Sequence, residues 1–217
     1  MNMEQARFNM IEQQIRTWDV LDQGVLDLLA RVPREDFVPL SYRNLAFADT
    51  HIPLGHGQVM MPPKLEARLI QSLNIKHEDV ILEIGTGSGY LTALLASLGR
   101  HVFSVDICDE FTASAQRRLA EHDITNVTLE TGDAALGWDK HGPYDIIAIT
   151  GSLPIYSEKF QQSLNLGGRL FAVFGTAPAM EALLITRRGA LRWVSESLFE
   201  TSLPPLINAP HPPSFML

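Results

Sequence analysis

The chain has 217 residues, of which 46% are hydrophobic and 19% charged, an ordinary composition for a globular protein that buries a sizeable core. Lys and Arg number 17 against 25 Asp and Glu, and the net charge of −8 argues against nucleic-acid binding, which needs a basic surface. The single cysteine, Cys108, excludes an internal disulfide and a cysteine-based zinc site, and no metal site is expected. Neither a signal peptide nor an apolar stretch of about 20 residues that could span a membrane is recognisable, so a cytoplasmic location is predicted.

The N-terminal part of the chain predicts two short helices followed by a loop. Apolar residues recur at helical spacing between residues 4 and 30, and Asp19 and Asp22 divide this segment in two. Residues 41–63 contain three prolines and two glycines and are expected to be rich in loop. Loops of this length inside a compact domain are often functional. Leucine and isoleucine at helical spacing predict the next helix, over residues 65–73.

Strand and helix patterns alternate from residue 80 onward. The predicted strands cover residues 80–84, 101–105, 127–129, 145–150 and 169–174, with helical patterns between most of them, such as 111–121 and 157–164. Residues 182–187 and 191–199 flank a turn at Gly189 and predict an antiparallel hairpin at the sheet edge. This order predicts an α/β fold: a doubly wound, mainly parallel seven-stranded sheet with helices on both faces, N-terminal helices and a C-terminal β-hairpin.

One domain is expected over residues 1–217. Residues 1–63 would supply the N-terminal helices and a loop on the substrate side, and residues 64–200 the α/β core that binds a cofactor. Residues 201–217 form a proline-rich tail, and because proline cannot continue a helix, this tail is predicted to be extended.

The most informative stretch is a glycine turn, Gly-Thr-Gly-Ser-Gly at residues 85–89, between a buried-type strand and a helix. Glycines let the backbone approach a ligand closely, and the following helix offers unpaired N–H groups. The dinucleotide-binding fingerprint places its third glycine at the position that Tyr90 occupies here. Gly-x-Gly-x-Gly after a strand containing Glu83 instead resembles motif I of the class I S-adenosylmethionine-dependent methyltransferases.

Polar residues follow the predicted strands where ligands bind in doubly wound sheets. Asp106 ends the second strand and can accept hydrogen bonds from both hydroxyls of a ribose, and Asp133 follows the third strand, where it could meet an adenine amino group. The alternative interpretation is that these aspartates cap helices or form turns. Together with the glycine turn they favour a nucleoside-type ligand. The predicted cofactor-binding residues are Glu83, Gly85, Thr86, Gly87, Ser88, Gly89, Asp106, Ile107, Asp133, Ala134 and Thr150.

Further motifs resemble one methyltransferase family. They are Gly-Asp-Ala-Ala-Leu-Gly-Trp at residues 132–138, Leu-Gly-Gly-Arg-Leu at 166–170, Arg-Val-Pro-Arg at 31–34 and Leu-Gly-His-Gly-Gln at 54–58. This pattern, spread over residues 30 to 190, is similar to that of the protein-L-isoaspartate (D-aspartate) O-methyltransferases. The resemblance implies methyl transfer from S-adenosyl-L-methionine to the carboxyl group of isoaspartyl (D-aspartyl) residues in damaged proteins. Because a carboxylate is already ionised at neutral pH, such a site needs alignment and exclusion of water rather than a general base.

One position departs from the family pattern. In the family, Gly-x-Gly-Gln is followed by Thr-Ile-Ser or close variants, and the serine is associated with substrate handling and catalysis. Met61 occupies that serine position here, and a thioether cannot donate a hydrogen bond. The predicted substrate-side residues are His56, Gln58, Met60 and Met61, and Met61 is the residue assigned to the catalytic position.

Three functions stay open at this point. The first is isoaspartyl methylation, and the second is methylation of a different carboxylate or of a small molecule, with Met60 and Met61 lining a more apolar acceptor pocket. The third is a binding protein that keeps the cofactor pocket and has lost catalysis. A NAD-dependent dehydrogenase is disfavoured by Tyr90 and by the absence of a recognisable proton donor.

Overall fold

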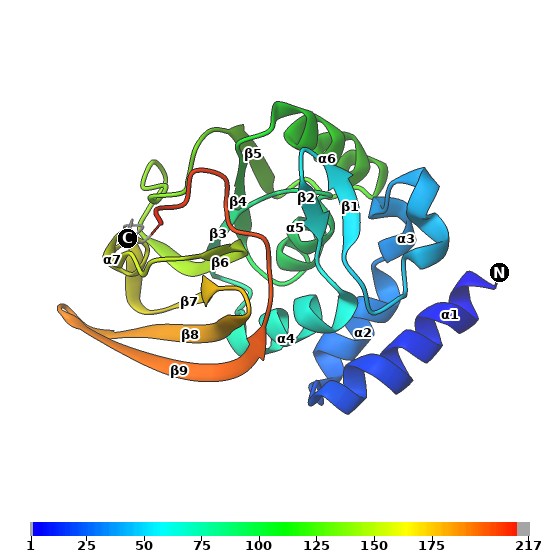
Figure 1. Cartoon of the computed structure of the whole chain (residues 1–217), viewed down its shortest axis with the longest axis horizontal. Helices are drawn as coiled ribbons and strands as arrows, with labels where there is room; N and C mark the ends of the chain where they lie inside the picture. The colour runs from blue at the N-terminus through cyan, green and yellow to red at the C-terminus, as the bar shows by residue number, and fades with distance from the viewer. Residues whose placement is uncertain (1, 212–217) are drawn as a thin grey trace, which may run out of the picture.

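The computed structural model describes residues 2–211 and is built around a seven-stranded sheet with the strand order β5-β4-β3-β6-β7-β8-β9 (Figure 1). Strands β3 to β7 run parallel, and β8 and β9 pair antiparallel at one edge. This confirms the predicted mainly parallel sheet and the C-terminal hairpin. The strands are β3 (Val80–Ile84), β4 (His101–Asp106), β5 (Val127–Thr131), β6 (Tyr144–Leu153), β7 (Leu164–Thr176), β8 (Ala179–Gly189) and β9 (Arg192–Thr201).

Each face of the sheet has its own hydrophobic core, because side chains alternate along the strands. Ile81 and Ile146 face the larger core, which the helices α4 (Pro63–Leu73), α5 (Tyr90–Ala96) and α6 (Asp109–Glu121) cover. The next residues along the strands, Leu82 and Ile147, face the smaller core, together with the short helix α7 (Glu158–Gln162). Helices therefore lie on both faces, as predicted, but three of these four pack on the same one.

The N-terminal segment forms helices that pack beside α4. Helix α1 (Met3–Met10) continues through a π-helical turn η1 (Ile11–Ile15) and a 3-10 turn η2 (Arg16–Trp18), and ends at Asp19 with a positive φ of 59°. Helix α2 (Gln23–Arg31) then starts at Asp22, whose carboxylate accepts a hydrogen bond from the backbone N–H of Val25 at 3.2 Å. Both aspartates thus act at the predicted break. Two short elements follow, α3 (Arg34–Phe37) and η3 (Leu40–Leu45).

Residues 41–63 hold more regular structure than the predicted loop. Besides η3, they contain a two-stranded antiparallel hairpin, β1 (Ile52–Gly55) and β2 (Gln58–Met60). His56 and Gly57 form its turn with φ values of 51° and 70°, the backbone that a two-residue hairpin loop requires. The prediction was wrong on this point because strands of four and three residues, one with a proline, carry too little alternation to be recognised.

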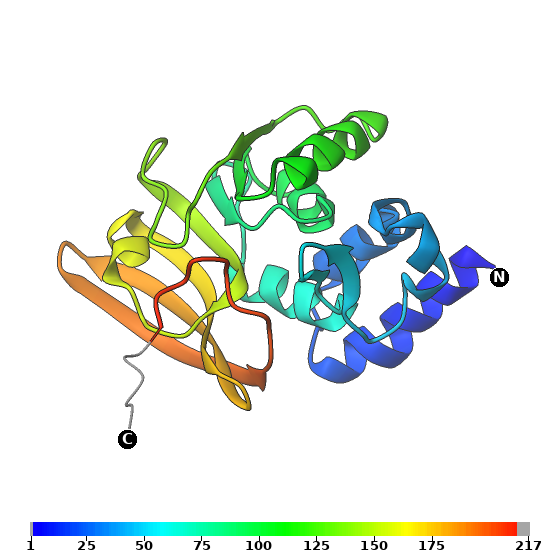
Figure 2. The same cartoon turned by 45° about the horizontal axis from the view of Figure 1, so that its top comes forward.

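The C-terminal segment after β9 turns back across the carboxyl ends of the parallel strands and faces the β1–β2 hairpin (Figure 2). The backbone N–H of Ser152 in β6 donates to the carbonyl of Pro204 at 2.9 Å, and the N–H of Leu206 donates to the carbonyl of Ser152 at 3.0 Å. The described part of the tail contains no helix, as predicted, but it is not extended throughout, because Asn208 has a φ of 65° and the N–H of Ala209 donates to the carbonyl of Leu206 at 3.0 Å around a turn. Residues 212–217 lie outside the described residues. Within residues 2–211, no helix combines the length and the apolar character that crossing a bilayer requires.

Candidate functional site

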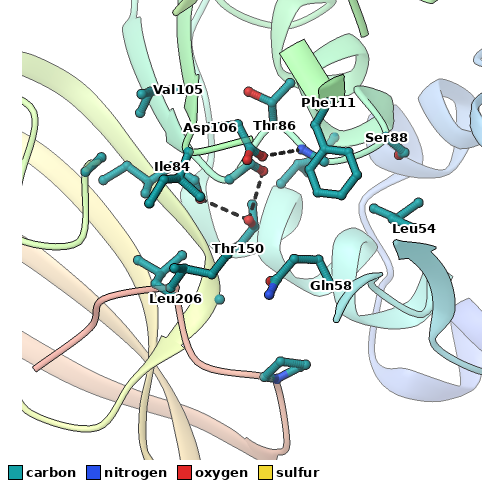
Figure 3. A pocket seen from close by; sticks show the side chains of 18 of the residues that line it. Leu54, Gln58, Ile84, Thr86, Ser88, Val105, Asp106, Phe111, Thr150 and Leu206 are labelled. Carbon is teal, nitrogen blue, oxygen red and sulfur yellow. Dashed lines mark hydrogen bonds between the residues drawn. The ribbon is translucent and has the colours of Figure 1, made fainter. Parts of the chain in front are cut away.

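A cavity opens at the carboxyl ends of β3, β4 and β6 and has a volume of about 850 Å³, counting the space open to solvent at its mouth. Figure 3 shows its walls: Leu54 and Gln58 come from the β1–β2 hairpin on one side, and Leu206 comes from the C-terminal segment on the other. The position agrees with the ligand site expected for a doubly wound sheet. Further lining residues are Val59, Met60, Met61, Glu66, Ile84, Gly85, Thr86, Gly87, Ser88, Leu91, Val105, Asp106, Ile107, Phe111, Gly132, Asp133, Ala134, Ala135, Thr150, Gly151, Pro204 and Ile207.

The glycine turn forms the floor of the cavity, and Gly85 lies against Thr150. Gly85 has a φ of 95°, and a Cβ atom there would stand 2.1 Å from Thr150 Oγ1. That hydroxyl donates to the carbonyl oxygens of Ile84 and Gly85, both at 2.9 Å (Figure 3). Glycine is therefore required at residue 85 by both the backbone conformation and the space, which lets the turn close tightly on β6.

Asp106 holds the glycine turn at the end of β4. Its Oδ2 accepts a hydrogen bond from the N–H of Gly87 at 2.9 Å, and its Oδ1 accepts one from the N–H of Cys108 at 2.9 Å. Burial raises the pKa of Asp106, and the backbone donors oppose that shift. The carboxylate lines the cavity, so its remaining acceptor capacity faces the space where a ligand would lie.

Asp133 joins the segment after β5 to the C-terminal segment. Its Oδ1 accepts from the N–H of Ala135 at 3.0 Å, and its Oδ2 accepts from the side-chain amide of Asn208 at 2.9 Å. The first bond matches the alternative interpretation of Asp133 as a turn former. Asp133 nevertheless lines the cavity beside Ala134, on the β5 side of the sheet.

Three predicted site residues do not line the cavity. Glu83 is completely buried and accepts hydrogen bonds from the hydroxyls of Thr92 at 2.5 Å and Ser104 at 2.6 Å, and burial raises its pKa to about 8. Gly89 precedes the first residue of α5 and packs against Ala115 of α6. His56 lies at the tip of the hairpin, with Nε2 2.9 Å from Glu110 Oε2. Glu83 thus bonds to side chains of α5 and β4, and Gly89, the last glycine of the turn, faces α6.

Both methionines of the unusual segment line the cavity. Met60 and Met61 are 3% and 5% exposed. The backbone of Met61 is fixed because its carbonyl accepts a hydrogen bond from Arg34 Nη2 at 2.6 Å. Arg34 is itself 1% exposed and also donates from Nε to the carbonyl of Ala46 at 2.8 Å and from Nη1 to the carboxylate of Glu66. The position that carries serine in the family pattern is therefore a rigid, apolar part of the wall.

Several lining residues escaped the sequence prediction. Glu66 carried a usable signal, since it is a charged residue beside Leu65, Leu69 and Ile70 on the buried face of α4. Leu206 and the residues around it carried none, because they reach the cavity only through contacts with β6, such as the hydrogen bond from Ser152 Oγ to the carbonyl of Leu203 at 3.0 Å. Gly151 makes this approach possible, since a Cβ there would stand 2.8 Å from a methyl group of Leu206.

Comparisons with known proteins agree with this geometry. The family model described as protein-L-isoaspartate(D-aspartate) O-methyltransferase (PCMT) matches residues 5–203. A protein-L-isoaspartate O-methyltransferase of Synechococcus sp. (strain JA-2-3B'a(2-13)) is 34% identical over 207 residues, covering 93% of this chain and 85% of the relative. Another from Vibrio vulnificus (strain YJ016) is 37% identical over 188 residues, covering 87% of this chain and 89% of the relative.

Solved structures show the same fold. A protein-L-isoaspartate O-methyltransferase superposes with a TM-score of 0.76 at 23% identity, over 92% of this chain and 65% of that chain. A putative protein-L-isoaspartate O-methyltransferase from Plasmodium falciparum, solved in complex with S-adenosyl-L-homocysteine, gives a TM-score of 0.79 at 18% identity, over 95% of this chain and 98% of that one. With the family model matched over nearly its whole length, the chain belongs to the protein-L-isoaspartate(D-aspartate) O-methyltransferase family.

Proposed function

We propose that this chain binds S-adenosyl-L-methionine in the cavity and transfers its methyl group to the carboxyl group of L-isoaspartyl (D-aspartyl) residues in proteins or peptides. Membership of the family and the relatives' activity, given by their names, support the reaction. The observation that carries the proposal is the cavity at the glycine turn, with Asp106 at its centre. We also propose a cytoplasmic location and no nucleic-acid partner, which the single cysteine and the net charge of −8 support.

The lining residues fit the cofactor in shape and charge. Gly85 and Gly87 expose backbone at the floor, so an extended ligand can approach closely. Among the described lining residues the charged ones are Glu66, Asp106 and Asp133, and none is Lys, Arg or His. S-adenosyl-L-methionine supplies a methyl group on a positively charged sulfur, which makes that carbon open to attack. An acidic cavity favours such a cation, and Asp106 is the residue we assign to the ribose hydroxyls.

The protein's task in this reaction is alignment and exclusion of water. The acceptor carboxylate is the nucleophile and is ionised at neutral pH, so no residue has to remove a proton from it. Leu54, Phe111 and Leu206 supply apolar walls around the reacting space (Figure 3). Gln58 points into the cavity from the hairpin, and its amide is the donor we assign to the acceptor carboxylate, because Met61 cannot donate.

The second function, methylation of a different carboxylate or of a small molecule, has one supporting observation: the buried, apolar side chains of Met60 and Met61 in the cavity wall. One assay separates it from the first and from a protein that only binds the cofactor. The purified chain is incubated with isoaspartyl peptide and labelled S-adenosyl-L-methionine, and base-labile methyl ester is measured. Ester formation supports the proposal, whereas turnover only on other acceptors supports the second function. Cofactor binding without turnover on any acceptor supports the third.

The variant Met61→Ser tests in the same assay whether the missing serine limits isoaspartyl methylation. A hydrogen bond to a charged group is worth about 1.5–3 kcal/mol, so restoring the serine is expected to raise kcat/KM for the isoaspartyl peptide about tenfold or more. Met60→Ser is the matched control, because Met60 is equally buried in the same wall, and no gain is expected from it. If Met61→Ser creates isoaspartyl activity that the natural chain lacks, the natural acceptor is a different molecule.

A further inference from the structure

Glu66 is an acidic residue of helix α4 that is buried instead of exposed to solvent. It is 2% exposed, lies on the buried face of the helix and lines the cavity beside Met61. Its Oε2 accepts a hydrogen bond from Arg34 Nη1. Its Oε1 accepts no hydrogen bond from any of residues 2–211. Because Glu66 lines the cavity, a ligand or water there can reach this oxygen and supply the missing hydrogen bond.

The pairing with Arg34 does not satisfy this carboxylate. Arg34 divides its donors among Glu66, the carbonyl of Ala46 and the carbonyl of Met61, so only Nη1 serves the acid. Burial raises the pKa of Glu66 to about 7 in spite of the nearby guanidinium. A further positive charge against Oε1 would therefore stabilise the ionised form.

The other two acids of the cavity differ from Glu66. Asp106 accepts from the backbone N–H groups of Gly87 and Cys108, and Asp133 accepts from the N–H of Ala135 and the amide of Asn208. Both have each oxygen in at least one hydrogen bond, whereas Glu66 keeps one oxygen without a donor among the described residues. Of the three, Glu66 is the acid best placed to bind a cationic hydrogen-bond donor directly.

The sheet order places the three acids in sequence along the cavity. Asp133 follows β5, Asp106 ends the neighbouring β4, and Glu66 lies on α4, which packs against β7, further along the same strand order. If Asp106 binds the ribose, the adenine lies towards Asp133 and the methionine part lies towards Glu66. The methionine part carries an α-ammonium group, and the acceptor enters at the same end, beside Met61 and Gln58.

We propose that Glu66, oriented by Arg34, binds a protonated amine at the α4 end of the cavity. The inference rests on the proposed function, because it takes the cofactor's orientation from Asp106. The amine has two sources, the α-ammonium of the cofactor or an amino group of the acceptor peptide. Both present the same chemistry, N–H donors with a positive charge, to the free carboxylate oxygen.

Calorimetry on the full chain tests the cofactor source without turnover. Three ligands are titrated: S-adenosylhomocysteine, its analogue in which hydrogen replaces the amino group, and 5′-methylthioadenosine. Glu66→Gln is expected to weaken S-adenosylhomocysteine about tenfold or more and to change the other two less than about twofold. Asp133→Asn is the matched control, since it also removes one negative charge from the cavity, and it is expected to weaken all three ligands alike.

Kinetics with two isoaspartyl peptides tests the acceptor source, one peptide with a lysine beside the isoaspartyl residue and one with a neutral residue there. If the acceptor supplies the amine, Glu66→Gln leaves S-adenosylhomocysteine binding unchanged and raises KM for the lysine peptide only. Glu66→Asp keeps the charge and is measured in parallel, so that selectivity for the amine can still be read if Glu66→Gln unfolds. Equal effects on ligands and peptides with and without the amine would overturn the inference, whereas a natural chain that binds no S-adenosylhomocysteine would overturn the proposed function.

Discussion

Replacing Gly85 by alanine tests whether the glycine turn depends on its close contact with β6. A non-glycine residue in the left-handed region costs about 1–2 kcal/mol. The new Cβ would also stand 2.1 Å from Thr150 Oγ1, which forces that side chain away from the carbonyls of Ile84 and Gly85. Overpacking of this kind costs about 1–3 kcal/mol, so Gly85→Ala is expected to lower the free energy of unfolding by about 2–5 kcal/mol.

Urea unfolding measures this loss, and two further variants separate its causes. Gly57→Ala is the matched control, because Gly57 has a φ of 70° and the Cβ that alanine would add meets no described heavy atom within 4 Å, so only the backbone cost of about 1–2 kcal/mol is expected. Adding Thr150→Ala to Gly85→Ala removes Oγ1 and should restore part of the loss, as judged in a double-mutant cycle with Thr150→Ala alone. If Gly85→Ala costs no more than Gly57→Ala and shows no coupling to residue 150, the turn does not depend on its close contact with β6.

Three more predictions concern the acids of the core and the cavity. Asp106→Ala is expected to weaken S-adenosyl-L-methionine binding at least about tenfold in calorimetry, because a buried charged hydrogen-bond acceptor is lost, and an unchanged affinity would contradict its assignment to the ribose. Burial raises the pKa of Glu83 to about 8 from 4.5, so between these pH values the native state holds a proton that the unfolded chain releases. The contribution of this proton to the free energy of unfolding is complete below about pH 4.5, and it falls by about 1.4 kcal/mol per pH unit as the pH rises to about 8. Glu83→Gln should flatten this part of the pH–stability curve in denaturant titrations, and an unaltered slope would show that Glu83 titrates normally. Asn208→Ala removes the hydrogen bond to Asp133 and is expected to speed hydrogen exchange of residues 203–209, while equal exchange rates would mean that the contact with β6 suffices.

Much of the α/β core could be predicted because each strand carries its own pattern. The run at residues 80–84 is apolar and ends in a glycine turn, and both features are local. The turn brings Gly85, Gly87 and Asp106 together, since the carboxyl ends of neighbouring parallel strands lie at one edge. Local pattern and sheet topology were therefore enough to find the floor of the cavity.

The direction of a side chain was not predictable in the same way. Glu83 lies two residues before the turn, which suggested a ligand contact, but strand alternation directs it to the face covered by α5, where Thr92 and Ser104 bind it. The opposite error applies to Glu66, whose helix pattern indicated only a buried face. Which face of α4 meets the cavity depends on how α3 packs against α4. Arg34 of α3 joins the two through hydrogen bonds to residues 46, 61 and 66.

The walls of the cavity were the least predictable part. The β1–β2 hairpin is short and its turn is formed by His56 and Gly57, so it resembles a loop in composition. The C-terminal wall depends on pairing between Ser152 and residues 203–206, about fifty positions later in the chain, which no local pattern encodes.

The C-terminal wall has a consequence for the order of synthesis. The ribosome makes the glycine turn, β4 and β6 well before residues 203–209, yet these later residues supply Pro204, Leu206 and Ile207 to the cavity and pair with β6. A nascent chain can therefore fold its parallel sheet while one side of the cavity is still open. The ligand site is completed only when residues 203–209 have left the ribosome, so chains that stop before these residues expose an incomplete site on an otherwise folded core.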